Sequence, residues 1–164
     1  MHIFFDIDYT ILETDYGTLR PGVRDVFEKL GTDGHTVYIW SGIGARTEEV
    51  KALGLYDLVG GVFPKPWENY EISVDNMLAK KEIPVRPDLV VDDTAAIVRA
   101  LGGIVVAQYG AIGCANDQEM ERVYRIIKEY TVNGYSRHPA FRKLSSRTLL
   151  RTEDKIVSLR NLST

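Results

Sequence analysis

The sequence contains a single cysteine, Cys114, among its 164 residues. One cysteine excludes an intramolecular disulfide framework and a zinc site built from several cysteines. No apolar run approaches the roughly 18 residues that a membrane-spanning helix needs. The N-terminal residues lack a basic segment ahead of an apolar stretch, so we expect no signal peptide, no membrane association and a cytoplasmic protein.

Positive charge is also scarce over most of the chain. The net charge is -3, which argues against a dedicated nucleic-acid-binding protein. Basic residues are concentrated near the end, where residues 137–164 hold seven basic and two acidic residues. We therefore predict one catalytic domain over residues 1–131 and a basic extension over residues 132–164. Because the extension also contains apolar residues, we expect it to pack on the domain or on a second subunit of a homo-oligomer; binding of nucleic acid is the less favoured alternative.

Short apolar segments alternate with amphipathic ones along the chain. The pattern predicts strands at residues 3–5, 36–40, 61–63, 88–91 and 104–107, and helices at 23–30, 44–53, 70–81, 94–101 and 117–131. Gly31 is expected to end the first helix, and residues 11–20 to form a small hairpin. Strands that alternate with helices through short connections predict an α/β fold with a doubly wound, mostly parallel sheet.

Polar and charged side chains follow the predicted strands. In a doubly wound sheet the binding crevice lies at the carboxyl ends of the strands. Two carboxylates as close as Asp6 and Asp8 repel each other unless a cation lies between them, and all-oxygen ligands favour Mg²⁺. A hydroxyl, a backbone amide and an ammonium group at the same edge suit a phosphate dianion. The candidate residues are Asp6, Asp8, Thr10, Ser41, Gly42, Lys65, Asp92 and Asp93.

Four of these segments match known motifs in the same order along the chain. They are Asp6-Ile7-Asp8-Tyr9-Thr10 (DxDxT), Trp40-Ser41-Gly42, Lys65, and Val90-Val91-Asp92-Asp93. Over residues 1–110 the chain therefore resembles the haloacid dehalogenase superfamily of phosphotransferases. The resemblance implies a magnesium-dependent phosphomonoester hydrolase that acts on a phosphorylated small molecule or macromolecule.

The resemblance also implies roles for the four aspartates. Asp6 would attack phosphorus to form an aspartyl-phosphate, and Asp8 would act as general acid and then general base. Asp6, Asp92 and the backbone carbonyl of Asp8 would bind Mg²⁺. Asp93 would bind the metal directly or support it from the outer shell, although capping of the helix at 94–101 is an equally weighted alternative.

The phosphate-binding set implied by the resemblance is Thr10, Ser41, Gly42 and Lys65, with Thr10 bracing the Asp6 loop. Lys80 and Lys81 are weaker alternatives for the lysine. The gaps between Thr10 and Ser41 and between Ser41 and Lys65 are too short for a cap domain, so the chain is similar to capless members. Residues 19–27, followed by residues 37–41, are more weakly similar to the phosphatases of the polymerase C-terminal domain.

Several alternatives remain beside this interpretation. Arg46 could reach a phosphate, but a solvent-facing ion pair with Glu48 or Glu49 is favoured. Trp67 and Tyr16 have two possible roles. They either form walls of the open site that recognise the substrate, or they pack in the core or at the rim of the domain. A receiver domain also places Asp, Ser or Thr, and Lys at strand ends, but its acidic pair precedes the hydroxyl and the lysine. A catalytically silent protein that keeps the fold for binding is the alternative function.

Overall fold

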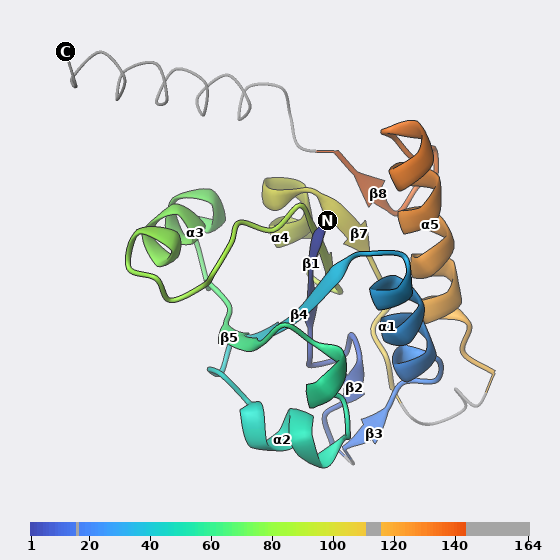
Figure 1. The fold of residues 1–164 in the computed structure, drawn as a ribbon, viewed down its shortest axis with the longest axis horizontal. Coiled ribbons are helices and arrows are strands. Elements are labelled where there is room, and N and C mark those ends of the chain that lie inside the picture. Colours follow the sequence, from blue (N-terminus) through green and yellow to red (C-terminus); the bar gives the residue numbers. More distant parts are fainter. Residues whose placement is uncertain (16, 111–115, 144–164) are drawn as a thin grey trace.

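A six-stranded sheet lies at the centre of the computed structural model, which describes residues 1–15, 17–110 and 116–143. In the described residues the sheet has six strands in the order β5-β4-β1-β6-β7-β8 (Figure 1). Five of them are parallel, and β8 pairs antiparallel with β7 at one edge. The strands are β1 (His2–Asp6), β4 (Thr36–Ser41), β5 (Val62–Pro64), β6 (Leu89–Asp92), β7 (Gly103–Val105) and β8 (Phe141–Arg142).

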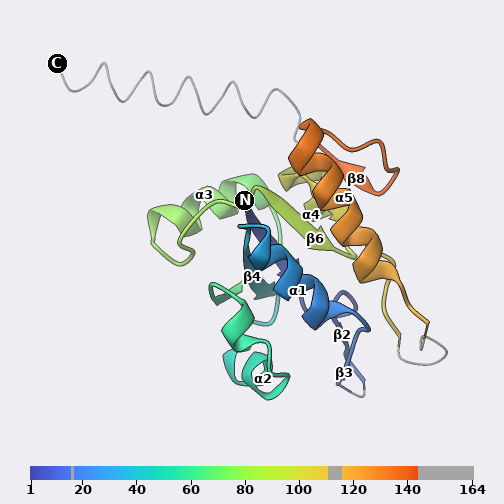
Figure 2. The same cartoon turned by 45° about the vertical axis from the view of Figure 1, so that its right-hand side comes forward.

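Helices cover both faces of this sheet, as expected for a doubly wound fold. Helices α1 (Val23–Thr32) and α5 (Glu119–Asn133) pack beside each other on one face (Figure 1, Figure 2). Helices α3 (Tyr70–Ala79) and α4 (Ala95–Leu101) cover the other face. Neighbouring residues of β1 serve opposite cores, because Phe5 packs with α1 and α5 whereas Phe4 packs with α3 and α4. Burial on both faces explains why β1 is a continuous apolar run.

The connections between the first strands are short. A two-stranded hairpin, β2 (Leu12–Glu13) and β3 (Thr18–Leu19), lies with α1 between β1 and β4. Helix α2 (Thr47–Ala52) and the 3-10 helix η1 (Tyr56–Leu58) lie between β4 and β5. The α/β fold with a mostly parallel sheet and a small hairpin is therefore confirmed. These elements account for the described residues of both connections, which contain no cap domain.

The end of α1 differs from the prediction. Gly31 lies inside the helix, which continues to Thr32, so the expectation that Gly31 ends it is wrong. The chain leaves the helix at Gly34, whose φ of 80° lies in the left-handed region that glycine adopts without strain. Gly31 is exposed on the helix surface, and a glycine there weakens a helix without breaking it.

The C-terminal part of the described chain adds two features to the sheet. Helix α5 continues past residue 131 to Asn133, and β8 places residues 141–142 of the predicted extension on the edge of the sheet beside β7. Residues 144–164 and Cys114 lie outside the described residues, so the packing of the extension stays a prediction. In the described ranges we find no helix with both the length and the apolar character needed to cross a bilayer.

Candidate active site

The topology brings the predicted residues to one edge of the sheet. From β1 the chain continues to β4 and β5 on one side, and then to β6 and β7 on the other. The order therefore reverses between β1 and β6, and ligands of such sheets bind in the crevice at this point. Asp6 ends β1 and Asp92 ends β6, and the pairing of Phe5 with Val91 keeps the two ends level.

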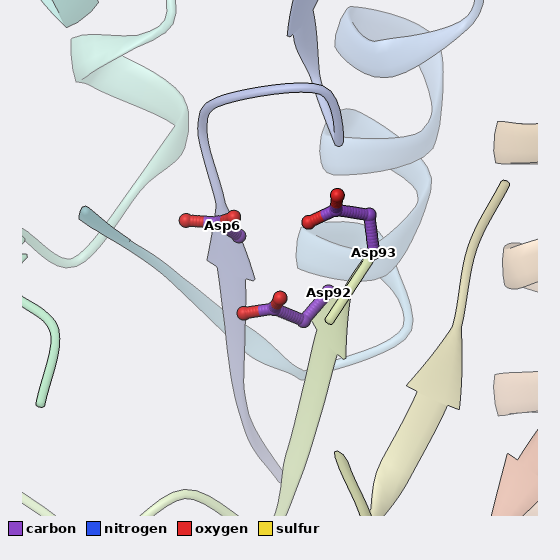
Figure 3. Close-up of side chains that lie close together, drawn as sticks. All are labelled: Asp6, Asp92 and Asp93. Atoms are coloured by element: carbon purple, nitrogen blue, oxygen red, sulfur yellow. The ribbon is translucent and has the colours of Figure 1, made fainter. Parts of the chain in front are cut away.

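Three carboxylates converge at this crevice. One oxygen from each of Asp6, Asp92 and Asp93 lies within 4.8 Å of the others (Figure 3). Asp6 is 3% exposed and Asp92 is fully buried, at 0%. Burying like charges together is costly unless a cation compensates them. The cluster could therefore hold a metal ion.

Lys65 supplies one positive charge to the cluster. Its Nζ lies 2.8 Å from Asp6 Oδ1 and 3.1 Å from Asp92 Oδ2, and its side chain is only 14% exposed. The backbone N–H of Lys65 donates to the carbonyl of Ser41 at 2.9 Å, which fixes the residue just after β5 beside the end of β4. Burial lowers the pKa of Lys65, but the charges of Asp6 and Asp92 outweigh it and raise that pKa above its usual value. Lys65 thus stays charged.

One lysine does not neutralise both buried carboxylates. Burial, and then the neighbouring charge of Asp92, raise the pKa of Asp6 to about 7, against the opposing effect of Lys65. Burial raises the pKa of Asp92 as well, again opposed by Lys65. In the metal-free protein the cluster therefore takes up a proton that a divalent cation would replace.

This protonation predicts that Asp6 contributes less to the stability of the metal-free protein at neutral pH than at acidic pH. The pKa of Asp6 is about 7 in the folded protein and 3.8 in the unfolded chain, so between these values the folded state binds the extra proton. The contribution of Asp6 to the free energy of unfolding should fall by roughly 1.4 kcal/mol per pH unit from pH 5 to pH 7, and level off above pH 7. Urea unfolding in chelator at several pH values measures this slope.

The control for that slope is Asp6→Asn, which cannot titrate. His35 contributes the opposite slope, because burial lowers its pKa. The difference between wild type and Asp6→Asn removes the effect of His35. An equal pH slope in the two proteins would contradict the raised pKa of Asp6.

Asp8 lies apart from the three clustered carboxylates and is held by three donors. Ser41 Oγ and Thr14 Oγ1 each donate to it at 3.3 Å, and Arg46 forms an ion pair with it. Arg46 also pairs with Glu49, one of its two expected partners. Its side chain is only 16% exposed and contacts Asp8 as well, so the expected solvent-facing position is wrong and the contact with Asp8 was not predicted. These contacts hold the Asp8 carboxylate outside the acidic cluster of Asp6, Asp92 and Asp93.

Asp93 does not cap helix α4. The N-cap position is Thr94, and no side chain caps the helix there, so the capping alternative is wrong. Instead, the Asp93 carboxylate accepts a hydrogen bond from Gln108 Nε2 at 2.8 Å, and its backbone N–H donates to Thr10 Oγ1 at 3.1 Å. Thr10 thus ties the loop after β1 to the end of β6, in keeping with the bracing role expected of it.

A cavity of about 320 Å³ opens above these groups. It is lined by Asp6, Asp8, Tyr9, Gly42, Ile43, Lys65, Pro66, Trp67, Tyr70, Asp93, Thr94 and Ile97. Five of the predicted site residues, Asp6, Asp8, Gly42, Lys65 and Asp93, therefore face one cavity. The other three, Thr10, Ser41 and Asp92, are fully buried and do not line it.

The predicted alternatives for an aromatic wall and for the phosphate-binding lysine also differ in whether they line the cavity. Trp67 lines the cavity, whereas Lys80 and Lys81 follow α3 and do not. Tyr16 lies outside the described residues. The position of Trp67 on the cavity agrees with the prediction that this residue forms a wall of the site.

Sequence reasoning missed the group that anchors the loop after β1. Arg20 is buried and makes a bidentate ion pair with Asp117, with N–O distances of 3.0 and 2.9 Å. Its third nitrogen donates to the carbonyls of Thr10 and Ala107, each at 3.0 Å. Arg20 therefore ties the loop that carries Asp8 to the segment after β7, with no local sequence signal that could have indicated it.

Comparisons with known proteins add no further assignment. A scan against protein-family models, a search of curated proteins and a search of solved structures each found no match to this chain. Chemically, the site combines a buried acidic cluster, a charged lysine and a separately held carboxylate around one cavity. This set can bind a cation and an anionic ligand together.

Proposed function

We propose that this chain is a magnesium-dependent phosphomonoester hydrolase of the haloacid dehalogenase type, with Asp6 as the nucleophile. The observation that carries the proposal is the setting of Asp6. It lies at the switch point of the sheet, lines the cavity, and contacts Lys65 beside two further carboxylates. A carboxylate needs a cation to approach a phosphate dianion, and this setting supplies the Lys65 ammonium and two carboxylates that could bind a metal ion with Asp6.

The residues present fit a magnesium ion. The candidate ligands are all oxygens, which suits a hard cation. Asp6 Oδ1 is buried and accepts no well-directed hydrogen bond, with the Lys65 ammonium as its ionic neighbour. Asp6, Asp92, Asp93 and the backbone carbonyl of Asp8 would hold the ion. When bound, Mg²⁺ neutralises the phosphoryl oxygens and favours attack by an anionic group.

The chain's own residues account for both half-reactions. In the first, a carboxylate oxygen of Asp6 forms a bond to phosphorus, the ester P–O bond breaks, and Asp8 gives its proton to the leaving oxygen. In the second, Asp8 takes a proton from water as the water oxygen attacks phosphorus. The acyl-phosphate bond then breaks, which releases inorganic phosphate and regenerates the Asp6 carboxylate. Lys65 and the Gly42 amide hold the phosphoryl oxygens during both steps.

The direct test is release of phosphate from 4-nitrophenyl phosphate by the full chain with Mg²⁺. We expect turnover that stops in excess chelator and returns when Mg²⁺ is restored. Beryllofluoride, a mimic of a phosphoryl group, should attach to Asp6 and can be located by crystallography. Turnover that persists in chelator, or attachment at another residue, would sink the mechanism, and a chain that binds Mg²⁺ without turnover would be a silent binding protein.

Asp8→Asn should separate the two half-reactions. A nitrophenolate group leaves without a proton, so the variant should still release about one equivalent of nitrophenol in a burst. Later turnover should fall about 10²- to 10⁴-fold, because no base activates the water. An alkyl phosphate needs the proton and should give no burst. Rapid-quench measurement of both substrates checks this, and equal bursts would contradict the role of Asp8.

A further inference from the structure

The wall of the cavity differs in character from its floor. The charged lining residues, Asp6, Asp8, Lys65 and Asp93, are here called the floor. The remaining lining, called the wall, is largely apolar and aromatic. The apolar lining consists of Tyr9, Ile43, Pro66, Trp67, Tyr70 and Ile97. A pocket with convergent polar groups at one end and an aromatic wall suits a ligand with one charged and one apolar part.

Trp67 is the most distinctive part of this wall. It is 73% exposed, although tryptophan is usually well buried, and Ile43 on the same cavity is 70% exposed. The indole lies over Gly42, because a Cβ atom at that position would be only 3.3 Å from its ring. The ring is therefore held next to the backbone amide that would bind the phosphate. An exposed aromatic ring at the rim of a polar site is a ready contact surface for a ligand.

Charge restricts what this ligand can carry besides its phosphate. Among the described residues that line the cavity, Lys65 is the one with a positive charge. Arg46 is already paired with both Asp8 and Glu49. Even with one Mg²⁺ and Lys65, the four site aspartates leave no surplus of positive charge. A second anionic group on the substrate would therefore meet no free cation.

We propose that the substrate is a phosphate monoester whose phosphate-bearing group is a planar, uncharged ring that packs against Trp67. This inference rests on the proposed function and adds the substrate class to it. The phosphate binds at the floor beside Asp6 and Lys65, and the ring lies along the apolar wall. Ring-to-ring packing favours aromatic groups over flexible alkyl groups of similar size, because planar faces stack at little entropic cost.

The test uses phosphonates, which bind as phosphate esters do but cannot be hydrolysed. Calorimetry on the magnesium-loaded full chain compares benzylphosphonate, which carries a ring, with hexylphosphonate, which carries a flexible alkyl group of similar size. We expect benzylphosphonate to bind about tenfold more tightly, in line with the strength of aromatic pairs. Trp67→Ala should remove this preference, chiefly by weakening the binding of benzylphosphonate, and Trp67→Phe should keep most of it. Ile72→Ala is the matched control, because Ile72 is 64% exposed but does not line the cavity.

The outcomes separate this inference from the proposed function. If the two phosphonates bind equally to the wild type, or if Trp67→Ala keeps the preference, the ring contact is overturned while the phosphatase assignment stands. If neither phosphonate binds in the presence of Mg²⁺, both proposals fail. Quenching of tryptophan fluorescence by benzylphosphonate gives a second readout, since the other tryptophan, Trp40, is fully buried.

Discussion

Asp6→Asn is expected to lower kcat for 4-nitrophenyl phosphate about 10⁴-fold or more, since it removes the nucleophile itself. Asparagine has the shape of aspartate, and its amide can still occupy the end of β1. It carries no negative charge, however, so it forms no bond to phosphorus and attracts a metal ion less strongly than aspartate does. The measurement is steady-state phosphate release with Mg²⁺. Activity of Asp6→Asn close to that of the wild type would remove Asp6 from the reaction.

Loss of activity in this variant can be separated from loss of structure. The raised pKa of Asp6 shows that its charged form is destabilised by burial and by Asp92. A neutral side chain at position 6 should therefore make the metal-free protein more stable than the wild type at pH 8. An Asp6→Asn protein that is inactive and more stable has lost chemistry, whereas one that is inactive and unfolded says nothing about catalysis.

The acidic cluster could be anticipated from the sequence for a topological reason. The carboxyl ends of parallel strands meet at one edge, so residues that directly follow apolar runs become neighbours whatever their separation along the chain. Asp6 and Asp92 satisfy this rule at β1 and β6, and Lys65 satisfies it after β5. Their placement required only that the strands and their order be right.

Contacts made by long side chains could not be anticipated in this way. Arg20 and Asp117 are 97 positions apart and meet only after the hairpin and the loop after β7 have taken their places. Arg46 has Glu49 within one helical turn, which predicts that pair, but its contact with Asp8 depends on how α2 sits against the loop after β1. The two-residue strand β8 is similarly defined by pairing with β7 and not by its own composition.

Lys65→Met should produce the second large effect, because it leaves two buried carboxylates without their cation. Lys65 Nζ lies 2.8 Å from Asp6 Oδ1 and 3.1 Å from Asp92 Oδ2, and methionine keeps most of its length without the charge. Removing one partner from a buried ion pair costs about 3–5 kcal/mol, so the free energy of unfolding in chelator should fall by roughly that amount at pH 8. Phosphate release should fall about 10²- to 10³-fold, because a donor to the phosphoryl oxygens is lost.

Two conditions should restore the stability of Lys65→Met. Recovery under both would identify the missing positive charge as the cause of the lost stability. Lowering the pH to 5 protonates Asp6, whose pKa rises further without the lysine, and added Mg²⁺ replaces the missing positive charge. Lys80→Met is the matched control. The Lys80 side chain is 70% exposed, and its Nζ lies 3.9 Å from Glu82 Oε1. Loss of this exposed ion pair should change the free energy of unfolding by no more than about 0.5 kcal/mol. If Lys65→Met is no less stable than Lys80→Met at pH 8 in chelator, Lys65 does not neutralise the cluster. If its deficit persists at pH 5 and with Mg²⁺, the cause is lost packing and not charge.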